Sequence, residues 1–71
     1  MKLVPVSPIK LCKFLEKEGF VALRQTGSHK IFKHKDGRRT VVPIHPRHIK
    51  LELLGVILKQ IKISRNEFLK R

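Results

Sequence analysis

Four histidines are the side chains of this chain best suited to chemistry at neutral pH: His29, His34, His45 and His48. An imidazole can bind a metal or transfer a proton. His45 and His48 have an i, i+3 spacing, but Pro46 disfavours a helix that begins before it, and no nearby carboxylate completes a metal site. We therefore expect no metal, and we expect each histidine to be solvated or hydrogen-bonded unless it transfers a proton.

His29 is the strongest candidate for proton transfer, because it follows Gly27-Ser28 at the start of a predicted strand over residues 29–34. Strand alternation divides this segment into two faces, one with His29, Ile31 and Lys33 and the other with Lys30, Phe32 and His34. Phe32 is the larger core former, so we expect it to face the helices. His29 and Lys33 should then share an exposed basic face.

A histidine among cations favours its neutral form, because neighbouring positive charge disfavours protonation. Neutral imidazole can accept a proton as a general base. RNA offers the 2′-hydroxyl, whose oxygen attacks the adjacent phosphorus while Lys and Arg stabilise the phosphate charge. This route needs no metal or cofactor, and it would leave DNA bound but uncut. Ser28 is a weaker candidate nucleophile, because no His–Asp relay is visible nearby and Ser beside Gly is common in turns.

The charge balance favours a phosphate-rich partner. Lys and Arg number 17 and Asp and Glu number 5, so the formal net charge is +12. No acid lies between Val21 and Lys35, or between Gly37 and Ile49. Four Phe, with no Trp or Tyr, give little support for a base-stacking platform and favour contacts to the nucleic-acid backbone. Three alternatives stay open: a non-catalytic double-stranded RNA-binding module, a basic domain with a protein partner, and a merely basic protein.

Length and composition predict a single domain over residues 1–71, since 41% hydrophobic residues exceed what a disordered basic tail would have. The apolar N-terminal stretch is broken by Pro5, which disfavours a signal peptide, and no window approaches the roughly 20 apolar residues of a membrane span. Lone Cys12 can form no internal disulfide, so a reducing compartment fits. We expect a cytoplasmic protein without membrane contact.

The elements that must position His29 follow from local signals. Ser7-Pro8 predicts the start of a helix over about residues 8–18, with Cys12 on its apolar face, and Gly19 predicts its end. Residues 20–26, 29–34 and 39–44 are predicted strands of an antiparallel sheet. Asp36-Gly37 predicts a two-residue hairpin loop, and Pro43 requires that the third strand be an edge or end there.

The C-terminal part changes to a helical period from about Ile49. Leu54, Ile57, Leu58 and Ile61 form the apolar stripe of a second helix. Ser64 and Glu67 form a capping box that predicts a short helix over about residues 65–70. The expected fold is α+β, with order α-β-β-β-α, helices packed on one face of a three-stranded antiparallel sheet, and a short C-terminal helix.

Several motifs occur in a fixed order along nearly the whole chain. They are Ser7–Lys10, Gly19-Phe20, Arg24–Phe32 with its Gly-Ser-His, Asp36–Arg38, Val42–His45, Ile57–Gln60 and Ile63–Leu69. In this order and spacing the chain resembles the HicA-type toxins of bacterial and archaeal toxin–antitoxin pairs. The resemblance implies a fold like a double-stranded RNA-binding domain and a ribosome-independent mRNA endoribonuclease.

The resemblance also implies site residues and a partner. It makes His29 the catalytic histidine, and it implies a HicB-type antitoxin that binds the toxin and blocks this residue. The family often has an Arg near the start of the second long helix; none stands there in this chain, and Lys50 is expected to contact phosphate instead. The candidate RNA contacts are Arg24, Ser28, Lys30, Lys33, Arg39 and Lys50.

Overall fold

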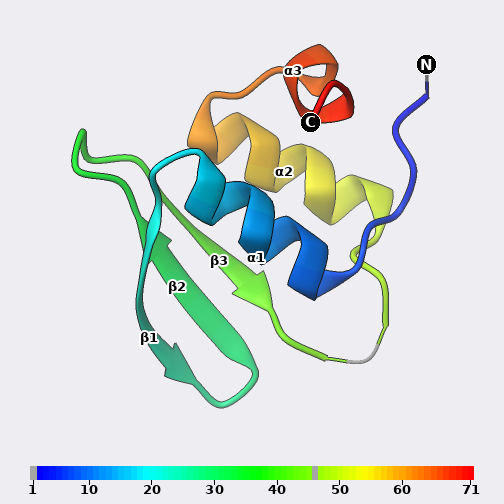
Figure 1. Cartoon of the computed structure of the whole chain (residues 1–71). Helices are drawn as coiled ribbons and strands as arrows, with labels where there is room; N and C mark the ends of the chain where they lie inside the picture. The colour runs from blue at the N-terminus through cyan, green and yellow to red at the C-terminus, as the bar shows by residue number, and fades with distance from the viewer. Residues whose placement is uncertain (1, 46) are drawn as a thin grey trace.

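The computed structural model describes residues 2–45 and 47–71. Met1 and Pro46 lie outside the described residues. The prediction that Pro46 disfavours a helix that begins before it therefore concerns a residue that the structure does not describe. The elements in chain order are α1 (Pro8–Lys17), β1 (Val21–Thr26), β2 (His29–Lys33), β3 (Arg39–Pro43), α2 (Leu51–Ile61) and α3 (Arg65–Leu69). Both long helices pack on one face of the sheet (Figure 1), which confirms the predicted α+β fold.

Helix α1 forms where its capping signals predict. The Ser7 hydroxyl oxygen accepts a hydrogen bond from the Lys10 N–H at 3.2 Å, and the helix ends at Lys17, shortly before Gly19. Its buried face includes Leu11, Leu15 and Cys12. Burial raises the pKa of the Cys12 thiol, so this side chain stays protonated and acts as a core residue.

The sheet has the order β1-β2-β3, with antiparallel pairing throughout, so β3 is an edge strand that ends at Pro43. Phe32 and Val42 are completely buried beneath the helices, and Thr40 is nearly so. The prediction that Phe32 faces the helices is therefore confirmed. Because side chains alternate, the residues on either side of these positions point to the opposite, outer face.

The two hairpin loops differ from each other. Thr26 pairs with His29, so Gly27-Ser28 is a two-residue loop, and Gly27 has a φ of 60°, as the first position of a type II′ turn requires. The prediction of a two-residue loop at Asp36-Gly37 is wrong. The Gly37 N–H donates to the His34 carbonyl, and Gly37 has a φ of 100°, which makes a three-residue loop with a glycine bulge.

Helix α2 buries its predicted stripe of Leu54, Ile57, Leu58 and Ile61 against the rest of the core. It begins at Leu51 rather than near Ile49, because Ile49 pairs in a β-bridge with Val6. The Ser64–Glu67 capping box of α3 is present as predicted. The ring of Phe68 then meets that of Phe14 edge to face at 4.8 Å, which packs α3 against α1. None of the helices described is long and apolar enough to cross a membrane.

Candidate active site

The outer face of the sheet carries three rows of side chains, because paired residues of antiparallel strands project to the same side. The rows, read from β1 to β3, are Val21–Lys33–Arg39, Arg24–Ile31–Val41 and Thr26–His29–Pro43. Three of the predicted RNA contacts, Arg24, Lys33 and Arg39, thus share one face with His29. These strands contain no Asp or Glu, so the face is cationic.

His29 lies at the start of β2, directly after the Gly27-Ser28 turn, and its side chain is exposed. Within residues 2–45 and 47–71, no hydrogen bond holds its ring. Both ring nitrogens are therefore accessible to a ligand. The predicted sharing of an exposed basic face by His29 and Lys33 is confirmed.

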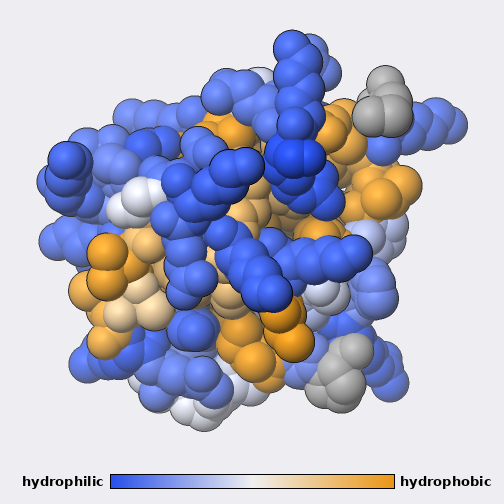
Figure 2. All heavy atoms as spheres, viewed as in Figure 1, coloured by the Kyte–Doolittle hydropathy of each residue, from blue (hydrophilic) through white to orange (hydrophobic). Residues whose placement is uncertain are grey.

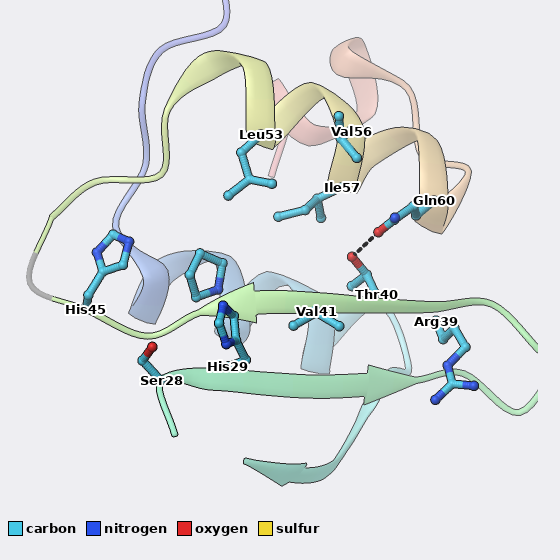
Figure 3. Close-up of a pocket in the computed structure, with 11 residues that line it drawn as sticks. Ser28, His29, Arg39, Thr40, Val41, His45, Leu53, Val56, Ile57 and Gln60 are labelled. Carbon is cyan, nitrogen blue, oxygen red and sulfur yellow. Dashed lines mark hydrogen bonds between the residues drawn. The ribbon is translucent and has the colours of Figure 1, made fainter. Parts of the chain in front are cut away.

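A groove of about 630 Å³ runs along the open edge of β3, between this strand and α2. Val41, Leu53 and Val56 form apolar walls, and all three are exposed. Figure 3 shows Ser28, His29 and His45 toward one end of the groove and Arg39 toward the other. Its volume lies within the roughly 300–1,000 Å³ of small-ligand sites. The groove places His29 beside space that a substrate can fill.

Helix α2 is held beside β3 by polar contacts. The Thr40 hydroxyl donates to the Gln60 side-chain oxygen at 2.6 Å (Figure 3). The Arg38 guanidinium donates to the Ile61 carbonyl at 2.5 Å and lies over the ring of Phe20, with 5.1 Å to its centroid. These contacts fix the width of the groove at the end farther from His29.

Most of the positive charge is not neutralised by neighbouring acids. Among the residues described, Asp36 forms an ion pair with Arg38 at 2.8 Å, and its carboxylate also lies 3.0 Å from Nδ1 of His34, which accepts a hydrogen bond from the Asp36 N–H. The pKa of the Asp36 carboxyl is lowered, first because the Arg38 backbone N–H donates to it and further because of the Arg38 side chain. Arg38 therefore has a structural role. Hydrophilic side chains cover much of the surface seen in Figure 2.

Two predicted RNA contacts lie away from the outer face. Lys30 pairs with Val42, which places it on the helix-facing side, and its ammonium lies 5.7 Å from the Phe32 ring centroid. Lys50 is exposed at the N-cap of α2 and does not line the groove. Their contact with RNA stays a prediction, on other surfaces than the one that carries His29. Ser28, by contrast, joins the groove beside His29.

The other histidines have separate environments. His34 packs edge to face against Phe20 and contacts Asp36, and His48 is exposed in the loop before α2. His45 lines the groove with His29, although sequence reasoning did not select it. The available signal was the Val42–His45 motif, which continues the strand that pairs with His29. The described residues contain no group of three or more His, Cys, Asp or Glu side chains that could hold a metal.

A family comparison covers the elements that build this site. A family model described as the HicA toxin of bacterial toxin–antitoxin systems matches residues 10–63. The matched segment contains the whole sheet, the groove and α2. A comparison with curated proteins gave no significant match. Because the family match spans well over half of the 71 residues, the chain belongs to the HicA toxin family of bacterial toxin–antitoxin systems.

Proposed function

We propose that this toxin is a metal-independent endoribonuclease that cleaves mRNA, with His29 as its general base. The observation that carries the proposal is the position of His29. Its ring is exposed, and no hydrogen bond from the described residues holds it. The ring lies beside the groove, on a face of the sheet that carries three arginine or lysine side chains and no carboxylate. A base of this kind can take a proton from a substrate that its cationic surroundings attract.

The reaction we propose is attack of a 2′-hydroxyl on the adjacent phosphorus. The proton of the 2′-hydroxyl moves to a ring nitrogen of His29, and the 2′-oxygen forms a bond to phosphorus. The bond from phosphorus to the 5′-oxygen breaks, and this oxygen takes a proton from water. The products are a 2′,3′-cyclic phosphate and a 5′-hydroxyl, and His29 returns its proton to solvent.

Phosphate contacts in this proposal come from Arg24, Lys33 and Arg39. Lys33 and Arg39 are paired neighbours at one end of the sheet, whereas His29 lies four positions away along β2. At a rise of about 3.3 Å per residue, this places Lys33 roughly 13 Å from His29. These cations therefore suit phosphates other than the one that is cleaved, and Ser28 beside His29 suits the cleaved nucleotide.

The family implies an antitoxin partner. We propose that this partner is a HicB-like protein that covers His29, and that its contact surface is acidic, because the outer face is cationic. The mRNA substrate would place both proteins in the cytoplasm. RNA and antitoxin would then compete for the same face, so that free antitoxin sets the activity of the toxin.

The test compares His29→Ala with His48→Ala, which removes an exposed histidine outside the groove. Expression of the unaltered chain and of His48→Ala should arrest growth, and His29→Ala should relieve the arrest. Cleavage of RNA by purified protein should fall by about 10²–10⁴-fold in His29→Ala, the usual contribution of a general base. Thermal unfolding should stay unchanged.

Equal cleavage by His29→Ala and the unaltered protein would overturn the assignment of the base. RNA that is bound by the unaltered protein but never cut would instead support the non-catalytic RNA-binding module.

A further inference from the structure

His45 approaches His29 because the strand pairing brings distant segments together. His29 pairs with Pro43, and the Ser28 carbonyl accepts a hydrogen bond from the Ile44 N–H at 2.5 Å. Paired Cα atoms lie about 4.5–5.5 Å apart, and two further residues add at most about 7 Å, so the two histidine Cα atoms lie within about 12 Å. Figure 3 shows both rings beside Ser28 at the same end of the groove.

The ring of His45 has a hydrogen bond that the ring of His29 lacks. The Arg47 N–H donates to Nδ1 of His45 at 3.2 Å. A neutral imidazole that accepts at Nδ1 carries its hydrogen on Nε2, so this ring offers one N–H donor. The two rings are thus prepared for different tasks. His29 is free to accept a proton, and His45 is set to donate a hydrogen bond.

We propose that His45 is a second catalytic residue, whose Nε2–H donates a hydrogen bond to a non-bridging oxygen of the cleaved phosphate. This inference rests on the proposed function and adds a residue to it. Negative charge grows on that oxygen as the 2′-oxygen adds to phosphorus, and a donor fixed beforehand stabilises it. His45 gives up no proton: the 2′-hydroxyl proton goes to His29, and water protonates the leaving 5′-oxygen.

Two substitutions separate this role from a purely structural one. In His45→Gln, the amide nitrogen reaches about as far as Nε2, so a donor to the phosphate is retained. In His45→Asn, the amide oxygen can still accept the Arg47 N–H, but no donor reaches as far as Nε2 did. The proposal expects His45→Gln to keep more cleavage activity than His45→Asn. A structural role expects the reverse order.

The experiment measures single-turnover cleavage of one RNA oligonucleotide by the unaltered protein, His45→Ala, His45→Gln and His45→Asn. His45→Ala should lower the rate by about 10²–10³-fold, the usual effect of removing one such donor. RNA affinity, measured with His29→Ala and with His29→Ala/His45→Ala, should change less than threefold. Thermal unfolding reports whether each variant folds, and the order of the Gln and Asn variants keeps the test valid if His45→Ala does not fold.

A second substrate distinguishes charge stabilisation from proton donation. An oligonucleotide with a bridging 5′-sulfur at the cleaved bond has a leaving group that needs no proton. The proposal expects the His45→Ala defect to persist on this substrate. If His45→Ala cut this substrate as fast as the unaltered protein does, the proposal would be overturned, because the role of His45 would then be to protonate the leaving group.

Rates within twofold of the unaltered protein for both His45→Ala and His45→Asn would overturn the role of His45 alone. Failure of the unaltered protein to cut RNA would overturn the proposed function together with this inference.

Discussion

Each histidine of this chain has a different set of neighbours, and these neighbours decide what its ring can do. His34 packs against Phe20 and contacts Asp36, so its ring holds the β2–β3 loop. The ring of His45 accepts the Arg47 N–H, and the ring of His29 has no hydrogen bond from the described residues. Chemical assignment therefore follows from the partners of each ring rather than from residue type.

Asp36 gives a prediction for acid stability at the residue scale. The pKa of its carboxyl is lowered by the Arg38 backbone N–H and then by the Arg38 side chain. A carboxyl with a lower pKa in the folded state stabilises the fold above its unfolded pKa, and this stabilisation is lost as pH falls through the folded pKa. Asp36→Asn should therefore unfold at lower urea concentration at pH 7, and the difference should begin to shrink as pH falls below about 4 and vanish below the lowered pKa.

Glu16→Gln is the matched control, because Glu16 is exposed and takes no part in the charged contacts described for Asp36. Its urea midpoint should follow that of the unaltered protein across the whole pH range. A constant offset of Asp36→Asn at all pH values would contradict the role of the charge. The effect should be small, since Asp36 is solvent-exposed.

Among the helices, the end of α2 shows how tertiary packing overrides local preference. Lys62 has a φ of 57° directly after Ile61, and the Ile63 N–H donates to the Leu58 carbonyl at 3.1 Å. This is the geometry of a Schellman motif, in which glycine is the usual residue. Ile63 and Leu58 are both buried, so their packing holds Lys62 in the left-handed conformation.

Lys62→Gly should stabilise the protein. A side chain in the left-handed region costs about 1–2 kcal/mol, and glycine offsets part of this gain through its greater freedom in the unfolded chain. We expect a net gain of about 0.5–1 kcal/mol in the free energy of unfolding, measured by urea denaturation. Lys62→Ala removes the same charge but keeps the strained conformation, so it should give no gain. Equal gains in both variants would assign the effect to charge.

The elements that could be predicted from sequence are those with local causes. Ser7 and the Ser64–Glu67 box mark helix starts because their hydrogen bonds span only three residues. The Asp36-Gly37 loop was mispredicted because the same dipeptide serves both a two-residue turn and the three-residue loop that forms. Which one forms depends on the pairing of β2 with β3, and this is a tertiary property.

The candidate site could be predicted only where strand alternation, a local property, decides which way a side chain points. The shared face of His29 and Lys33 follows from strand alternation and from the position of Phe32, whereas the place of Arg39 on that face follows from the register of β2 against β3. Lys30 was grouped with them by its charge, although alternation places it on the other side. His45 was missed because only the register of β2 against β3 brings it beside His29.

At the scale of the whole molecule, the charge of +12 is organised by the fold. The helices cover one side of the sheet (Figure 1). The register of the strands places His29, Arg24, Lys33 and Arg39 on the other side, where all four are exposed. If this face binds RNA phosphates, salt must weaken binding, because each neutralised phosphate releases counterions.

The dependence of RNA affinity on salt should locate the contacts. Each single-strand phosphate contact adds about −0.7 to the slope of log affinity against log salt concentration. Lys33→Ala or Arg39→Ala should therefore make the slope shallower by about 0.7. Lys13→Ala removes an exposed charge of α1, on the helix side of the molecule, and should leave the slope unchanged. The same change in all three variants would mean that overall charge, rather than the outer face, binds RNA.

The central claim is that His29 activates a 2′-hydroxyl for attack on the adjacent phosphorus. Removing the 2′-oxygen from one nucleotide of the substrate tests most directly whether that hydroxyl is the nucleophile. An RNA oligonucleotide that the protein cuts is compared with the same oligonucleotide carrying 2′-deoxyribose immediately before the cleaved bond. We predict cleavage of the all-ribose strand to a 2′,3′-cyclic phosphate and a 5′-hydroxyl, with the deoxy-substituted strand bound but uncut at that bond. Cleavage of the substituted bond at a comparable rate, or products with 5′-phosphate ends, would contradict the account.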